Sequence, residues 1–129
     1  IMGPVAFSLA VADGSPSAVT LHAWATCAAF GLHYIGTVPL VRSMIRGRKD
    51  PRWAMGSTLL HAAFTLCAAV AWWFGALTIW PVLVWACLSA RAWVMPTLNR
   101  TRARPFSPKL IGFSELGWSL LLIASLLIP

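Results

Sequence analysis

Long apolar runs separated by short polar segments dominate the pattern of hydrophobic and polar positions in this chain. The runs cover residues 1–12, 18–41, 53–77, 81–95 and 110–128. About 20 helical residues are needed to cross the hydrocarbon core of a bilayer, so we expect the first run to be an incomplete span. None of the runs shows the period-two alternation of a membrane barrel strand, and a backbone in hydrocarbon must satisfy its own hydrogen bonds. The sequence therefore predicts an all-α membrane protein with about five transmembrane helices.

Composition supports the same class. Only 10% of the residues are charged, against about 25% in a typical soluble domain, and 59% are hydrophobic. A chain with so few charges cannot cover itself with polar surface in water, so lipid or other apolar protein must shelter it. We expect residues 1–129 to form one helical bundle. The chain begins with Ile1 rather than methionine, so we also expect it to be the C-terminal part of a longer protein.

The positive charges are confined to two short windows, residues 42–52 and 91–109, and the loops between the other runs contain no Lys or Arg. Loops rich in Lys and Arg stay on the cytoplasmic side of a membrane. We therefore predict a protein of the bacterial cytoplasmic (inner) membrane whose basic loops are cytoplasmic and whose C-terminus lies outside. Basic side chains at the membrane surface attract anionic lipid headgroups, and we expect lipid rather than nucleic acid as their partner. These loop residues are Arg42, Arg46, Arg48, Lys49, Arg52, Arg100, Arg102, Arg104 and Lys109.

Four ionisable residues fall inside or at the ends of the apolar runs. His33 and His61 each lie roughly 12–13 Å from the cytoplasmic end of their run, Glu115 lies roughly 9 Å deep, and Arg91 is near the cytoplasmic end of its run. An ionisable group at membrane depth is costly and usually faces protein. Three interpretations remain open: hydrogen bonding between helices, a b-type haem held by His33 and His61, or a polar site for a small molecule, a quinone or a proton.

Within this cluster, Glu115 has the clearest expected partner. A carboxylate facing lipid would cost several kcal/mol, whereas a paired one costs much less. The runs that carry Arg91 and Glu115 are joined by a short segment, so they should be antiparallel neighbours. We therefore predict that Glu115 faces the protein interior and that Arg91 is its partner.

Residues with the spacing of known catalytic or metal-binding motifs are not visible. The sequence has no Gly-rich phosphate loop, no nucleophile beside a base and no metal-ligand run. Cys27, Cys67 and Cys87 are odd in number and lie inside apolar runs, which indicates neither a disulfide framework nor a zinc site. We predict no catalytic residue, no metal and no cofactor.

Several short motifs occur in the order found in one bacterial family. They are Tyr34-Ile-Gly-Thr-Val-Pro-Leu-Val-Arg-Ser-Met-Ile-Arg-Gly-Arg, Ser57 to His61, Ala90-Arg-Ala, Met95-Pro96, Arg104-Pro105, Pro108-Lys-Leu-Ile-Gly and Glu115. In this respect the chain resembles the YwiC-like family of bacterial integral membrane proteins, over roughly residues 30–128. The family's N-terminal half, with its His-Gly-Ala-Trp-type motif, has no counterpart here. A more distant likeness to prenyltransferases of the UbiA type implies paired aspartates that bind magnesium diphosphate, but Asp13 and Asp50 are isolated.

Two functional hypotheses follow. The first is a non-catalytic accessory subunit of a larger bacterial membrane complex, such as a respiratory one, with other membrane subunits as partners. It rests on the short loops and the missing catalytic motifs. The alternative is a membrane enzyme or transporter, similar to a degenerate prenyltransferase, with a site at the level of the cluster of His33, His61, Arg91 and Glu115.

Overall fold

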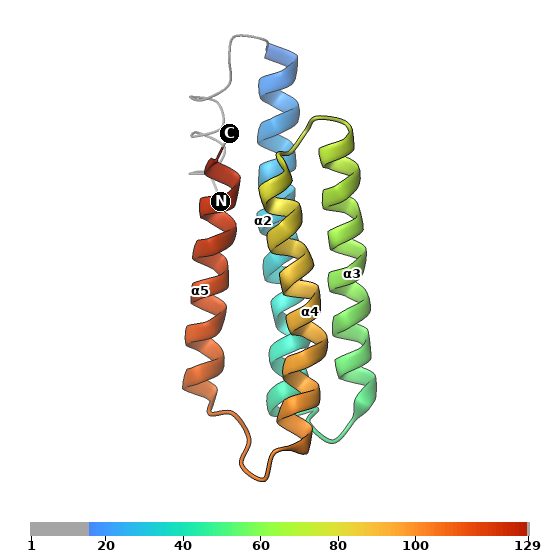
Figure 1. Cartoon of the computed structure of the whole chain (residues 1–129), viewed down its shortest axis with the longest axis vertical. Coiled ribbons are helices and arrows are strands. Elements are labelled where there is room, and N and C mark those ends of the chain that lie inside the picture. Colours follow the sequence, from blue (N-terminus) through green and yellow to red (C-terminus); the bar gives the residue numbers. More distant parts are fainter. Residues whose placement is uncertain (1–15, 129) are drawn as a thin grey trace.

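A computed structural model describes residues 16–128, and all regular secondary structure in that range is α-helical (Figure 1). The helices are α2 (Pro16–Ile45), α3 (Pro51–Trp73), α4 (Ile79–Thr101) and α5 (Pro108–Leu127). Each of the 4 contains a stretch that is long and apolar enough to cross a membrane. The predicted all-helical class is therefore confirmed for this part of the chain, and its four long apolar helices are compatible with a multi-pass membrane protein. The first predicted span, residues 1–12, lies outside the described residues, so the predicted count of five is not confirmed.

The helices run alternately up and down, and α2 packs against all three of the others (Figure 1). Helix α4 packs against α3 on one side and α5 on the other, whereas α3 and α5 do not contact each other. Helices α2 and α4 therefore form the centre of the bundle. Only 17% of the apolar window of α3 is buried, so the other described helices leave most of the surface of this helix uncovered.

Local sequence signals set the helix ends. Asp50 and Ser107 are N-caps, and their side chains accept hydrogen bonds from the backbone N–H groups of Arg52 (3.0 Å) and Leu110 (3.2 Å). Helix α3 ends at Trp73, four residues before the predicted end of its apolar run. The reason is Gly75, which adopts a φ of 72° and closes a Schellman turn in which the Ala76 N–H donates to the carbonyl of Ala71 (2.8 Å).

Helix α4 does not end at Met95, the last residue of the predicted apolar run. The helix continues through Pro96 to Thr101. A proline inside a helix leaves the carbonyl four residues earlier without its usual donor, and here that carbonyl belongs to Ala92. The hydroxyl of Thr58, on α3, donates to it at 3.2 Å. A neighbouring helix thus satisfies the backbone group that the proline frees, which is what makes proline tolerable inside a membrane helix.

Helix α2 likewise continues past the predicted end of its span at Val41 and includes Arg42 as far as Ile45. A basic residue marks the membrane boundary by its charge, but it is compatible with helical backbone, and its long side chain can reach the interface. The charge therefore predicts where the bilayer ends rather than where the helix ends.

The Thr58 hydrogen bond gives a direct test of how Pro96 is tolerated. Thr58→Val should destabilise the packing of α3 on α4 by about 1 kcal/mol, the size of an interhelical hydrogen bond in a membrane. In a Pro96→Ala background the Ala92 carbonyl regains an N–H donor, so the same substitution should cost less. Thr97→Val is the matched control, because the Thr97 hydroxyl donates only within α4, to Trp93. Equal costs of Thr58→Val in both backgrounds, measured by unfolding in detergent, would contradict this account.

The core consists of two apolar clusters with polar residues between them. One cluster surrounds Trp85, Leu88 and Leu122, and the other contains Leu40, Met44, Ala92 and Ile111. On α2, His33 and Thr37 come between the residues of the two clusters; on α4 and α5, Arg91, Glu115 and Ser119 do the same. These residues form a layer across the middle of the bundle.

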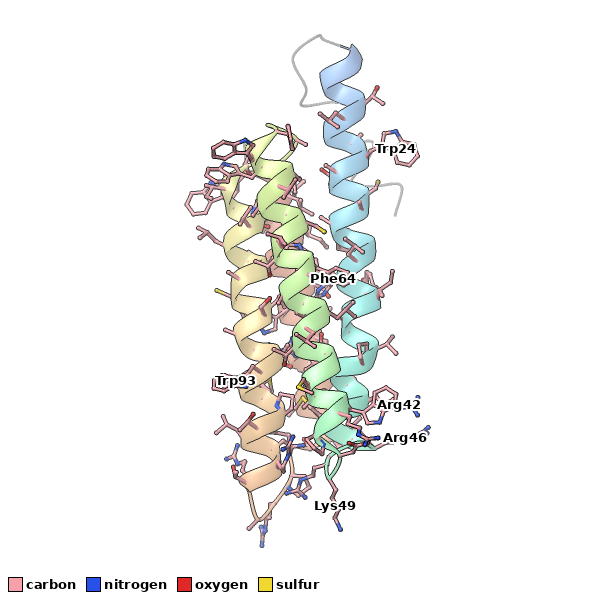
Figure 2. All side chains as sticks on the ribbon, turned by 90° about the vertical axis from the view of Figure 1, so that its right-hand side faces the viewer. Trp24, Arg42, Arg46, Lys49, Phe64 and Trp93 are labelled. Carbon is pink, nitrogen blue, oxygen red and sulfur yellow. The ribbon has the colours of Figure 1, made fainter. Side chains whose placement is uncertain are left out.

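Both basic loops lie at the same end of the bundle. Figure 2 shows Arg42, Arg46 and Lys49 at the end opposite Trp24. The α4–α5 loop reaches this same end, because Arg48 hydrogen-bonds to the backbone of residues on both sides of the α4 C-terminus. The structure therefore places the two basic windows at one end of the bundle, as a shared membrane face requires.

Candidate functional site

The strongest polar interaction in the interior joins α4 to α5. The guanidinium group of Arg91 donates from Nη2 to the Glu115 carboxylate, and this is the ion pair found within residues 16–128. The side chains are only 6% and 13% exposed, respectively. The predicted pairing of Glu115 with Arg91 is thereby confirmed. Both charges are neutralised inside the bundle instead of facing lipid.

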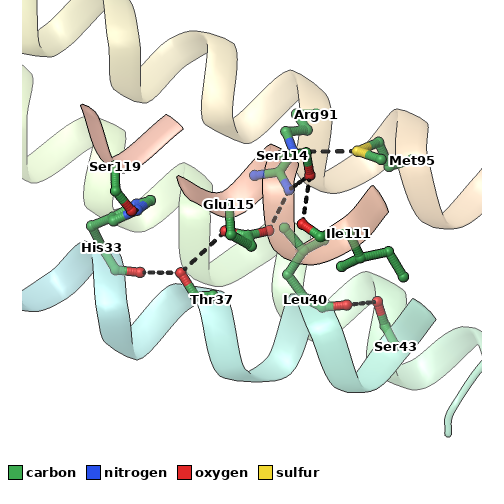
Figure 3. A network of polar contacts seen from close by, with 10 residues as sticks. All are labelled: His33, Thr37, Leu40, Ser43, Arg91, Met95, Ile111, Ser114, Glu115 and Ser119. Atoms are coloured by element: carbon green, nitrogen blue, oxygen red, sulfur yellow. Dashed lines mark hydrogen bonds and ion pairs between the residues drawn. The ribbon is translucent and has the colours of Figure 1, made fainter. Parts of the chain in front are cut away.

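Further hydrogen bonds extend this pair into a network over α2, α4 and α5 (Figure 3). The Arg91 Nη2 also donates to the Ser114 hydroxyl at 3.0 Å, and the Arg91 Nε lies 3.2 Å from the sulfur of Met95. On the other side, the Thr37 hydroxyl of α2 lies 3.5 Å from the second carboxylate oxygen of Glu115. We call His33, Thr37, Arg91, Ser114, Glu115 and Ser119 the polar layer.

His33 joins the polar layer through α5. Its Nε2 shares a hydrogen bond of 2.9 Å with the Ser119 hydroxyl, and its backbone carbonyl accepts from the Thr37 hydroxyl at 2.9 Å. The imidazole is 1% exposed. Two buried atoms of the layer, Nδ1 of His33 and Nη1 of Arg91, have no hydrogen-bond partner among the described residues.

His61 lies beside the polar layer without a hydrogen bond to it. Its Nδ1–H donates to the carbonyl of Ser57 in the preceding turn of α3, at 2.8 Å. Since a carbonyl only accepts, the proton of the imidazole is on Nδ1. The other ring nitrogen, Nε2, faces α2 at Gly36. The buried indole of Trp85 contacts both imidazoles, with ring centroids 6.2 Å from those of His33 and His61. The two histidines thus share an aromatic neighbour, while their Nε2 atoms face different elements, Ser119 of α5 and Gly36 of α2.

Gly36 is required because His61 leaves no space for a side chain. A Cβ at this position would lie 3.1 Å from both Cε1 and Nε2 of His61. We expect Gly36→Ala to force α2 and α3 apart and to destabilise the bundle by about 1–2 kcal/mol, the usual cost of overpacking. Gly31→Ala, on the same helix, is the control. Nothing lies within 4 Å of its new Cβ, so it should be neutral or stabilise by up to about 1 kcal/mol through helix propensity. Equal unfolding free energies for the two variants would contradict the tight contact.

A second buried polar group, which the sequence did not reveal, lies near the basic end. The Asn99 side chain is fully buried; its Nδ2 donates to the carbonyl of Met44 at 2.8 Å, and its Oδ1 accepts from the N–H of Phe106 at 2.8 Å. Arg48 donates from Nε to the carbonyl of Asn99 at 2.7 Å and from Nη2 to that of Arg102. We call Arg48 and Asn99 the loop clamp, because together they join the two basic loops. The one signal in the sequence for this buried side chain is its place three residues after Pro96.

The remaining basic loop residues have other surroundings. Arg42 stacks over the indole of Trp53 at 4.1 Å, and Arg102 stacks over Phe106 at 4.6 Å. The rest have exposed side chains, namely Arg46, Lys49, Arg52, Arg100, Arg104 and Lys109. The structure therefore separates the predicted polar residues into a buried layer, a loop clamp and an exposed basic end.

The chemistry open to the polar layer is limited by how its charges are used. Arg91 and Glu115 neutralise each other, and His61 is held by its own helix. Within residues 16–128, no three His, Cys, Asp or Glu side chains gather closely enough to hold a metal ion. Asp50, one of the chain's three acidic residues, caps α3 at the surface instead of facing this layer.

No protein-family model, curated protein or solved structure matches this chain. The resemblance to the YwiC-like family therefore stays a prediction from the sequence motifs.

Proposed function

We propose that this chain is a non-catalytic accessory subunit of a larger bacterial membrane complex, with a respiratory complex as one candidate. The observation that carries the proposal is the use of the intramembrane charges. The Arg91 guanidinium and the Glu115 carboxylate are bound to each other and hold α4 to α5, and Thr37 connects them to α2. Charged groups engaged in this way stabilise a bundle rather than act on a substrate.

The outer surface supports a role in assembly. On α3 the side chains of Leu66 and Trp73 are each more than 60% exposed in the described structure. Helices of partner subunits can pack on such a surface in the membrane, because van der Waals contact drives association there. The short loops, of which the longest in the described range joins α4 to α5, leave no soluble domain that would carry catalysis.

Purification from native membrane tests this proposal. In a mild detergent, the affinity-tagged chain should migrate in native electrophoresis as part of an assembly much larger than its own 14.0 kDa, with defined partners identified by mass spectrometry. The purified wild-type chain should show no Soret absorption band of a bound haem. A Soret band that disappears in the His33→Ala variant would contradict this expectation. Migration of the chain alone, at every detergent concentration that preserves its helical content, would refute the accessory-subunit proposal.

The alternative, a membrane enzyme or transporter, is favoured by one specific observation. Nδ1 of His33 and Nη1 of Arg91 are buried polar atoms without partners in the described structure. An unsatisfied buried polar group costs about 1–3 kcal/mol and calls for an explanation, one of which is a bound ligand or proton. Solvent extraction of the same preparation distinguishes the two functions. A stoichiometric quinone or other small molecule that His33→Ala releases, with the chain migrating alone, would support this alternative.

The membrane orientation is testable by cysteine labelling. We propose that the basic end faces the cytoplasm, because the positive-inside rule places Lys and Arg there. In a variant without the three native cysteines, Lys49→Cys should react with an impermeant maleimide only after the cells are permeabilised, whereas Phe74→Cys should react in intact cells. Both positions are exposed; Gly47 would be a poor choice, because a Cβ there would lie 2.8 Å from Trp53. The reverse labelling pattern would overturn the orientation.

A further inference from the structure

A groove of ≈ 430 Å³ lies between α3 and α4 at the basic end of the bundle. Its size is within the range of about 300–1,000 Å³ that ligand sites in proteins occupy. Two arginines from different helices line it: Arg52, in the first turn of α3, and Arg100, in the last turn of α4. The other lining residues are Pro51, Ala54, Met55, Thr58, Leu59, Trp93 and Thr97.

The groove is apolar below its two arginines. The single hydroxyl proton of Thr58 is shared between the carbonyls of Ala54 and Ala92, and that of Thr97 is donated to the carbonyl of Trp93. Both hydroxyl protons are thereby directed to the backbone, so neither side chain offers its proton to a ligand. Met55 and Leu59, which are 63% and 65% exposed, contribute apolar surface that faces the membrane.

The charges at the groove are free to bind a ligand. Neither guanidinium group makes an ion pair within residues 16–128, where Arg91 and Glu115 form the one pair found. None of the residues that line the groove is acidic. Asp50, the nearest acidic residue in sequence, lines a separate groove between α2 and α3 and accepts a hydrogen bond from the Arg52 backbone N–H. Arg52 also lines that second groove.

We propose that the α3–α4 groove binds one anionic phospholipid, whose phosphate lies between Arg52 and Arg100 and whose acyl chain runs along Met55 and Leu59. Charge complementarity and depth argue for this occupant. The two positive charges require an anion, while the apolar floor requires a hydrocarbon chain, and a phospholipid supplies both in one molecule. Trp93, 64% exposed, lines the groove from α4 and lies in the half of the bundle nearer the basic end (Figure 2). Tryptophan rings are enriched where a protein meets the lipid headgroups. This site is independent of the accessory-subunit proposal and requires only that the chain span a membrane.

Native mass spectrometry of the purified chain tests the proposal. The chain is titrated with dioleoyl phosphatidylglycerol and, separately, with dioleoyl phosphatidylcholine, which has the same acyl chains and no net charge. We expect one molecule of the anionic lipid to bind at least tenfold more tightly than the neutral one. Arg52→Gln combined with Arg100→Gln should weaken the anionic lipid by roughly 10- to 30-fold, since each basic residue near the surface contributes about fivefold.

Matched variants separate the groove from the general charge of the basic end. Arg104→Gln with Lys109→Gln removes the same two charges from exposed positions that do not line the groove, and it should change the affinity less than threefold. Thr97→Phe keeps both arginines but fills the groove, so it should also displace the lipid; Ala63→Phe, on an exposed face of α3 that does not line the groove, should not.

Three outcomes would overturn the proposal. Equal binding of the two lipids would show that charge is not recognised. Equal losses in the two double variants would show that the charge of the whole basic end is responsible. Displacement of the lipid by millimolar inorganic phosphate, with no effect of Thr97→Phe, would show that the arginines bind a free phosphate and that the groove has no role.

Discussion

Replacing Glu115 with leucine is expected to destabilise the bundle by about 3–5 kcal/mol, the largest effect we predict for a single substitution in the polar layer. The substitution leaves the guanidinium of Arg91 buried and positively charged without its counter-ion, and a guanidinium does not lose its proton to relieve the cost. Arg91 is only 7% exposed, so water cannot replace the carboxylate without opening the contact between α4 and α5. Unfolding in detergent micelles by titration with sodium dodecyl sulfate, followed by circular dichroism, measures the change.

Two companion variants show whether the lost interaction is the ion pair. Glu115→Gln should be tolerated better than Glu115→Leu, because the amide oxygen can still accept from Arg91. Combining Glu115→Leu with Arg91→Leu should recover most of the lost stability, since replacing both members of a buried pair with apolar residues is often neutral or stabilising. If Glu115→Leu unfolds at the same denaturant concentration as the wild type, or if the double variant is no more stable than Glu115→Leu, the pair does not contribute as proposed.

The Arg91–Glu115 pair was predictable because depth in a membrane helix follows from position in the sequence. Two ionisable residues at similar depths on helices joined by a short loop have few partners other than each other. Helix rotation about its axis is not encoded in the same simple way, because the apolar faces of membrane helices meet lipid as well as protein. For this reason the sequence could not show that Glu115 also approaches Thr37, or that His33 is bonded to Ser119 while His61 turns toward Gly36.

The helix ends illustrate the opposite case, in which a strong local signal was overridden. Pro96 favours the end of a helix, but the Thr58 hydroxyl of the neighbouring helix satisfies the carbonyl that the proline leaves free. The early end of α3 depends on Gly75, whose positive φ was not inferred from an apolar run that continues to Leu77. Local sequence predicts which backbone groups need a partner, but only the packing shows whether another helix supplies one.

The exposed apolar surface serves the proposed contacts with partner subunits, and the basic end serves the proposed binding of an anionic lipid. Among the described residues, the charges outside the internally neutralised polar layer lie at one end of the bundle, and much of the exposed apolar area lies on its helices. An accessory subunit needs no more than a stable interior and an outer surface that neighbouring subunits and lipids recognise. The groove between α3 and α4 is one place where both kinds of surface meet.

Replacing Asn99 with leucine is expected to cost about 2–4 kcal/mol and to loosen the connection between the two basic loops. The side chain is 0% exposed and makes two hydrogen bonds, one to the Met44 carbonyl at the end of α2 and one from the Phe106 N–H before α5. Leucine has the same branched heavy-atom skeleton, but it would leave a buried carbonyl and a buried N–H unsatisfied, each at a cost of about 1–3 kcal/mol. Asn99→Asp separates the two bonds, because a carboxylate can still accept from Phe106 but cannot donate to Met44. Because that carboxylate would be a buried charge against the Met44 carbonyl, its cost should be at least as large as that of Asn99→Leu, and hydrogen exchange should rise in residues 44–50 before it rises in residues 102–107. Thr101→Val, at an exposed position on the same turn of α4, is the control and should change neither stability nor exchange. If Asn99→Leu behaves like this control, the two basic loops are held together by Arg48 alone, through its bonds to the backbone of Asn99 and Arg102.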